Sequence, residues 1–119
     1  MPARKETGAW GEAIAARHLE AKGYVVLARN WRYDHGELDL IAEHGGVIVF
    51  VEVRARHGEA YGAPEETIGP AKRAKLMATV QAWLSVNDRL DSPARLDVIA
   101  IDLDPRNEVR RITHYENAL

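Results

Sequence analysis

The chain has 119 residues, of which 46% are hydrophobic and 29% are charged, a balance typical of a globular domain with one hydrophobic core. It contains no cysteine, which excludes disulfides, thiolate metal sites and cysteine nucleophiles. A formal net charge of −2 at pH 7 disfavours a protein that coats nucleic acid non-specifically, but not a nuclease, whose carboxylates bind divalent cations. We expect a single domain over residues 1–119, with no signal peptide and no membrane span, in the cytoplasm.

The N-terminal half of the chain predicts one helix followed by three strands. The helix runs from about Thr7 to Lys22, and Gly23 is the expected residue after its end. Four of its residues are spaced for one face: Glu12, Ala15, Ala16 and Leu19. The predicted strands cover residues 24–27, 36–44 and 47–56, with Arg29-Asn30-Trp31-Arg32 after the first and a Gly45-Gly46 turn between the other two.

The C-terminal half predicts a loop, a helix and two strands. Residues 57–69 are rich in Gly, Glu and Pro and form the loop, and Pro70 suits the first turn of a helix that ends at about Val86. The apolar face of this helix consists of Leu76, Val80, Trp83 and Leu84. Strands follow at 96–101 and 109–115, the second at a sheet edge. The order α-β-β-β-α-β-β predicts an α/β fold in which two helices flank a mixed sheet of about five strands.

The two-residue glycine turn predicts which residues of its hairpin face each other. If residues 44 and 47 pair, Asp39 lies opposite Glu52 and Glu37 lies opposite Arg54, with all four side chains on one face. The other face is expected to form an apolar patch that consists of Leu38, Leu40, Ala42, Val49, Val51 and Val53.

Directly opposed carboxylates on a strand pair require an explanation. Their Cβ atoms lie roughly 4.5–5.5 Å apart, and like charges at that distance are destabilising. Such a pair shares a proton, acquires a raised pKa or binds a cation, and oxygen ligands suit Mg²⁺ or Mn²⁺. The alternative is two solvated acids, with Glu37 and Arg54 as an ordinary ion pair. The apolar sequence around Glu52, and the position of Glu12 on a mainly apolar helix face, favour the metal site.

These residues resemble the PD-(D/E)XK nuclease signature, in which an acid precedes a strand that carries Glu-x-Lys. The wider match resembles the YraN family of small bacterial proteins, which is similar to archaeal Holliday junction resolvases. The matching segments are Gly11-Glu12, Gly23-Tyr24, residues 29–32, 36–41 and 49–53, and Arg95-Leu96-Asp97-Val98-Ile99. The resemblance implies a restriction-endonuclease-like three-layer fold with Glu12, Asp39 and Glu52 as metal-site acids. It places the catalytic lysine of the family at Arg54, a departure, because arginine is always protonated and cannot act as a base.

Two functions remain open at this point. The first is a Mg²⁺- or Mn²⁺-dependent endonuclease that hydrolyses phosphodiester bonds in DNA, including branched or damaged DNA. The second is a catalytically weak or inactive nucleic-acid-binding or adaptor module on the same fold, and either protein could form a homodimer. Candidate nucleic-acid-binding residues are Arg29, Arg32, Arg56, Lys72 and Arg73, with Trp31 and Tyr33 as stacking partners. The alternative for these is scattered surface cations and core aromatics; Asp97 is either a supporting acid of the site or a hydrogen-bonding residue at a strand end.

Overall fold

The computed structural model describes residues 4–57 and 69–118 as two helices on one five-stranded sheet. The elements are, in chain order, α1 (Arg4–Ala21), β1 (Val25–Tyr33), β2 (Gly36–His44), β3 (Val47–His57), α2 (Pro70–Val86), β4 (Ala94–Leu103) and β5 (Val109–Tyr115). The strands lie in sequence order, and only the β3–β4 pair is parallel. The predicted α/β class, the element order and the mixed sheet are confirmed, and the arrangement is consistent with a three-layer restriction-endonuclease-like fold. Within the described ranges, neither helix is long and apolar enough to cross a membrane.

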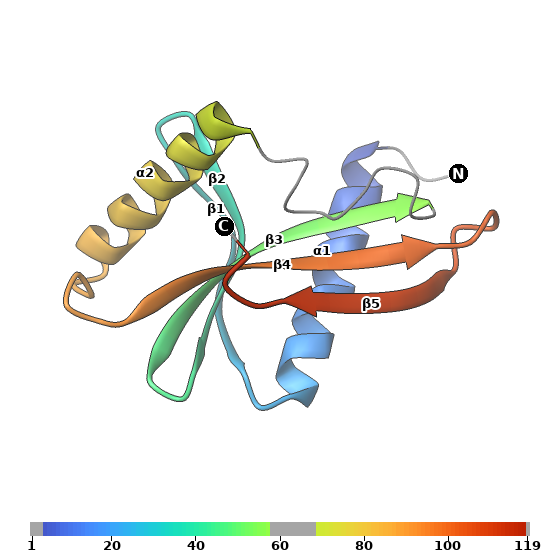
Figure 1. The fold of residues 1–119 in the computed structure, drawn as a ribbon, viewed down its shortest axis with the longest axis horizontal. Helices are drawn as coiled ribbons and strands as arrows, with labels where there is room; N and C mark the ends of the chain where they lie inside the picture. Colours follow the sequence, from blue (N-terminus) through green and yellow to red (C-terminus); the bar gives the residue numbers. More distant parts are fainter. Residues whose placement is uncertain (1–3, 58–68, 119) are drawn as a thin grey trace.

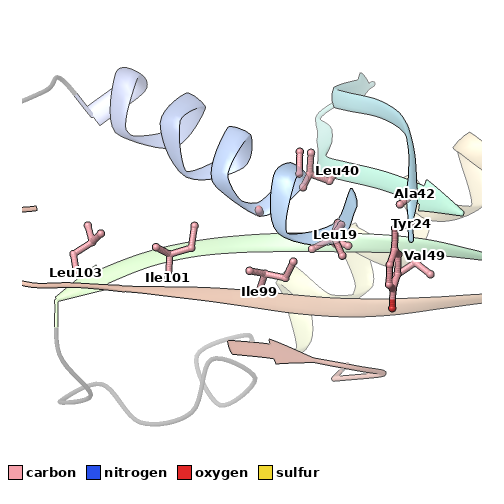
Figure 2. Close-up of a cluster of buried hydrophobic side chains, with 11 residues drawn as sticks. Leu19, Tyr24, Leu40, Ala42, Val49, Ile99, Ile101 and Leu103 are labelled. Carbon is pink, nitrogen blue, oxygen red and sulfur yellow. The ribbon is translucent and has the colours of Figure 1, made fainter. Parts of the chain in front are cut away.

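Each helix covers its own region of the sheet. Figure 1 shows α1 behind β3 and β4, whereas α2 lies beside β1 and β2. Under α1 the core includes the predicted Ala15, Ala16 and Leu19, and Figure 2 shows labelled side chains of this core between α1 and the strands. Under α2 the core contains all four residues of the predicted helix face. The sheet is therefore buried by a helix on each side, which explains the long apolar runs of β3 and β4.

Glycines end α1 and turn the β2–β3 hairpin as the sequence predicts. Gly23 has φ +89°, and the N–H groups of Gly23 and Tyr24 donate to the carbonyls of Glu20 and Leu19, the hydrogen-bond pattern of a Schellman motif. Gly45 and Gly46 both have positive φ, as a type I′ turn requires, and His44 pairs with Val47.

The first strand is longer than predicted. The sequence did not reveal its second half, because the alternation of its side chains is interrupted twice. The pairing of β1 with β2 shifts between Val26 and Ala28, and Asn30 has φ +51°. A bulge and a left-handed residue both break the period of two by which a strand is recognised in sequence. Residues 29–32, which we expected to follow the strand, are part of it, and the strand extends to Tyr33. The predicted loop at 57–69 lies outside the described residues except at its two ends, where His57 closes β3.

The prediction of which residues share the apolar face of β2 is wrong for Leu38. Leu40 and Ala42 pack with Val49 and Val51 under α1 as expected, but Leu38 packs under α2. The strand changes face between Leu38 and Leu40, opposite the irregular stretch of β1 at Asn30. The acid that lies between these leucines is Asp39.

Candidate functional site

The β2–β3 pair opens at the position of the two predicted acids. The register follows the glycine turn from His44–Val47 to Leu40–Val51 and then ends. Beyond this point the side chain of Asp39 replaces the backbone ladder, because its Oδ2 accepts a hydrogen bond of 2.8 Å from the N–H of Val53. The predicted apposition of Glu37 and Arg54 does not form. Glu37 instead pairs with Arg32 of β1, with 3.6 Å between Oε1 and Nε.

Glu52 lies beside Asp39 on β3 and is only 7% exposed. The two carboxyl groups interact through a side-chain hydrogen bond, which lowers the pKa of Asp39 and raises the pKa of Glu52. The Nζ of Lys72, in the first turn of α2, lies 3.5 Å from Oε2 of Glu52. The predicted pair is thus brought together, and Lys72 of α2 lies next to it.

Burial gives both acids unusual protonation behaviour. Burial, and then the charge of Asp39, raises the pKa of Glu52 from 4.5 to about 7, against the opposing charges of Lys72 and Arg54. Burial also raises the pKa of Asp39, although the hydrogen bond from Val53 acts in the opposite direction. At a pH between 4.5 and about 7, Glu52 therefore tends to keep a proton that an isolated carboxyl group has lost.

Glu12 reaches the same site from α1. Its pKa is raised, first by burial and then by the charges of Asp39 and Glu37, while a hydrogen bond with Asn30 opposes the rise. The sequence placed Glu12 correctly on the inner face of α1 but gave Asn30 no role. The only sequence signal for Asn30 was its residue type, since asparagine tolerates the left-handed conformation that turns it toward Glu12.

The acids open onto two clefts. The larger, of about 480 Å³, is lined by Gly11, Glu12, Glu37, Asp39, Glu52, Val53, Arg54, Ala55 and Lys72. The smaller, of about 250 Å³, is lined by His35, Gly36, Glu37, Asp39, Glu52, Lys72, Lys75, Leu76 and Thr79. The shared residues are Glu37, Asp39, Glu52 and Lys72. This part of the molecule is therefore concave, and the acid pair lies where its two clefts meet.

Arg54 is the second basic group of the larger cleft. Its Nε and Nη2 atoms are buried and have no hydrogen-bond partner within the described part of the chain. A buried donor without an acceptor is costly, and more so when it belongs to a charged group. The guanidinium therefore lacks the oxygen acceptors that a phosphate or carboxylate ligand provides.

The five predicted nucleic-acid-binding residues do not form one cluster. Lys72 lines both clefts, and Arg32 contacts the cleft residue Glu37. Arg29 and Arg73 are exposed but line neither cleft. The side chain of Arg56 is 13% exposed and forms an ion pair with Asp102, with 2.9 Å between Nε and Oδ1. Lys75, by contrast, lines the smaller cleft.

The donor set fits a hard divalent cation bound by two carboxylates. In the ranges that the structure describes, no three His, Cys, Asp or Glu side chains converge closely enough to form a metal cage. Mg²⁺ does not require such a cage, because it is bound in many phosphoryl-transfer sites by one or two carboxylates, waters and substrate oxygens. Asp39 and Glu52 would supply the carboxylates, and Glu12 is the nearby third acid. The metal site stays a prediction, with two principal ligands.

Asp97 belongs to a separate buried cluster. Its carboxylate accepts hydrogen bonds from Arg95 Nε at 3.1 Å, the N–H of Asn117 at 2.8 Å, and His114 Nε2 at 2.7 Å. It lines neither cleft that holds the acid pair. Asp97 is therefore a hydrogen-bonding residue, as one of the two expectations had it, although it lies inside β4 and not at the end of a strand.

The comparisons with known proteins agree on one family. Residues 11–101 match the sequence profile of the uncharacterised protein family UPF0102. A UPF0102 protein of Roseiflexus castenholzii is 46% identical, with 98% of this chain and 94% of the relative covered. A UPF0102 protein of Pelotomaculum thermopropionicum is also 46% identical, with 98% and 97% covered. A third relative, from Beutenbergia cavernae, is 42% identical, with 96% of each chain covered.

Proposed function

Because this chain belongs to the uncharacterised protein family UPF0102, we propose a function from the geometry of its cleft: metal-dependent hydrolysis of phosphodiester bonds in DNA. The observation that carries the proposal is the buried Asp39–Glu52 pair, which opens onto a cleft that also contains Lys72 and Arg54. Acids and cations that meet in a cleft match the needs of a phosphate ester and its metal ion. We place the activity in the cytoplasm, in keeping with the lack of cysteine.

The acids would hold the metal ion. Asp39 and Glu52 would be its ligands, with Glu12 close enough to bind a water of the same site. When bound, Mg²⁺ or Mn²⁺ would polarise a phosphoryl oxygen and lower the pKa of a water molecule. Because burial raises the pKa of both acids, binding of a cation and release of a proton would be linked at this pair.

The cations would bind the phosphate. Arg54 has two buried N–H groups without acceptors, and phosphate oxygens match the fork of a guanidinium. Lys72 adds a second positive charge next to Glu52, where charge accumulates on the phosphoryl oxygens during attack by water. In this proposal both side chains act by their position and positive charge. Arginine does not act as a base, and Lys72 forms an ion pair with Glu52.

The test is cleavage of end-labelled DNA with and without Mn²⁺, on duplex, branched and single-stranded substrates. Asp39→Asn and Glu52→Gln are expected to lower the Mn²⁺-dependent rate by at least about a hundredfold, since each removes a proposed metal ligand. Glu43→Gln is the matched control, because Glu43 lies on β2 like Asp39 but pairs with Arg89 instead. Equal rates for the parent and both cleft variants would contradict the proposal, provided that all of them unfold cooperatively at similar temperatures.

One observation favours a second candidate function. Arg54 occupies the position where the resemblance implies a catalytic lysine, so a DNA-binding or adaptor module with weak or no catalysis is the alternative. In that case the parent would bind DNA through the same cleft and show no Mn²⁺-dependent cleavage. The substitution Arg54→Lys separates the two functions.

A further inference from the structure

Two aromatic rings are stacked at the open end of β1. The rings of Trp31 and Tyr33 are nearly parallel, with an interplanar angle of 3° and 5.7 Å between centroids. Trp31 is partly buried against the core under α2, which fixes its ring, whereas Tyr33 is 52% exposed. The outer ring is thus held in place by a buried neighbour while it remains accessible to solvent.

This aromatic pair adjoins the smaller cleft. Tyr33 pairs with Gly36 across the β1–β2 hairpin, and His35, Gly36 and Glu37 line that cleft together with the acid pair. The hairpin packs closely against α2 at Gly36. A larger residue at position 36 would collide with Oγ1 of Thr79, so glycine is needed for this contact. The stacked rings therefore lie on the same hairpin as Asp39, next to the residues His35, Gly36 and Glu37 that line the cleft.

Positive charge accompanies the rings. Arg32, between them in sequence, has a side chain that is 74% exposed, and its ion pair with Glu37 is long at 3.6 Å. Arg29 is also exposed on the same strand. Aromatic faces flanked by arginines are the combination by which proteins hold single-stranded nucleic acid, in which the rings stack on bases and the cations contact phosphates.

We propose that Trp31 and Tyr33 form a stacking platform for an unpaired nucleotide of the DNA bound in the cleft. The faces of paired bases are covered by their neighbours in a duplex, so an exposed tyrosine ring has a partner only where a base is unstacked. The inference rests on the proposed function in taking DNA as the ligand of this cleft, and it names the substrate class: DNA that is single-stranded or locally unpaired next to the scissile bond.

The test is binding without cleavage. Fluorescence anisotropy with a labelled oligo(dT) 15-mer and with a blunt duplex of the same length, both with a chelator present, measures affinity independently of metal-dependent hydrolysis. The parent is expected to prefer the single strand, and Tyr33→Ala to weaken that binding about tenfold, the loss expected for one stacked base. Tyr33→Phe keeps the ring and is expected to restore the affinity. Leu27→Ala is the matched control, because it removes another exposed apolar side chain from β1.

The outcomes separate this inference from the proposed function. If Tyr33→Ala binds oligo(dT) as tightly as the parent, or if the parent binds the duplex equally well, the stacking platform is wrong even when Mn²⁺-dependent cleavage is present. If the affinity falls as expected but no cleavage occurs, the platform stands and the nuclease proposal fails. A Tyr33→Ala protein that changes only its elution volume in gel filtration would show that the rings bind a second copy of the chain, which also overturns the inference.

Discussion

Two of the buried acidic regions of the sheet have opposite character. In the first, which we call the C-terminal anchor, Asp97 is combined with Arg95 and His114; in the second, the acid pair of Asp39 and Glu52 is accompanied by Arg54. Each region has carboxylate and guanidinium groups at low exposure. The difference lies in whether these groups satisfy one another.

In the C-terminal anchor the charged side chains are hydrogen-bonded to one another. Asp97 is 0% exposed, and burial alone would raise its pKa, but hydrogen bonds from His114, Arg95 and the N–H of Asn117 lower the pKa below its usual value. Arg95 also donates to the hydroxyl of Tyr24 at 2.7 Å. The anchor joins β4, β5 and the segment that follows α1, so its charges stabilise the fold.

In the acid pair the charged groups are not compensated in this way. The pKa of both carboxyl groups is raised by burial, and two guanidinium nitrogens of Arg54 have no acceptor within the described residues. Buried charge without compensation costs stability, and such unsatisfied groups concentrate at sites that complete their interactions with a ligand. This difference favours a role in folding for the anchor and, as we propose, a role in binding for the acid pair.

The largest expected difference between the two regions is in stability. Asp97→Ala would leave Arg95 and His114 buried without their carboxylate and is expected to lower the free energy of unfolding by about 3–5 kcal/mol. Asp39→Ala removes a carboxyl group that burial disfavours but also leaves the N–H of Val53 without its acceptor, and it is expected to lower the free energy of unfolding by less than about 2 kcal/mol. Urea denaturation at pH 7.5 with a chelator present measures both values. An equal loss in the two variants would remove the distinction between the regions.

The pH dependence of stability sharpens the same comparison. The folded-state pKa of Glu52 is about 7, above its unfolded value of 4.5, so between these values the folded protein holds more protons than the unfolded chain. The stabilisation from this proton is complete below pH 4.5 and is lost as the pH rises through 7. At about 1.4 kcal/mol per pKa unit, the loss is on the order of 3 kcal/mol.

Glu52→Gln reports on the acid pair, because the difference between the two proteins cancels contributions from groups that do not interact with Glu52. The metal-free parent is expected to lose stability relative to Glu52→Gln from pH 4.5 to pH 8. Asp97 acts in the opposite sense, since its lowered pKa gives stability that is lost only when the pH falls below about 3.8, its ordinary value. A pH-independent difference between the parent and Glu52→Gln, measured by urea denaturation, would show that the acid pair is not protonated as described.

Much of the acid pair could be predicted from sequence, because local rules determine it. A two-residue glycine turn fixes the register of its hairpin, and that register brought Asp39 and Glu52 to the same place. The spacing of Glu12 from Ala15, Ala16 and Leu19 placed it on the inner face of α1. These inferences use periods of two and 3.6 residues, which are visible in any single sequence.

The rest could not be predicted, because it depends on irregular backbone and on contacts distant in sequence. The left-handed Asn30 and the change of face at Leu38 have no periodic signature, and together they divert Glu37 from Arg54 to Arg32. The partners of Asp97 in the anchor include His114, 17 residues away, and Arg95 reaches Tyr24 at a separation of 71 residues. Without these contacts Asp97 was indistinguishable from an acid of the cleft.

The two arginines provide the smallest and most discriminating contrast. Arg95→Lys shortens a side chain that bonds both Asp97 and Tyr24, and the expected loss in unfolding free energy is about 2 kcal/mol. Arg54→Lys removes two buried nitrogens that have no partner, and the expected change is less than about 1 kcal/mol. Thermal or urea unfolding of both variants compares the two positions directly.

The same Arg54→Lys protein decides between the two candidate functions, because lysine at this position restores a group whose pKa can shift. For a nuclease that already works with arginine, the parent cleaves DNA with Mn²⁺ and the lysine variant stays within about tenfold of its rate, since position and charge are kept. For a binding module derived from a nuclease, the parent is inactive and cleavage appears only with lysine. A large stability loss in Arg54→Lys would instead mean that Arg54, like Arg95, is a satisfied structural residue, and the contrast between the two regions would fail at its arginines.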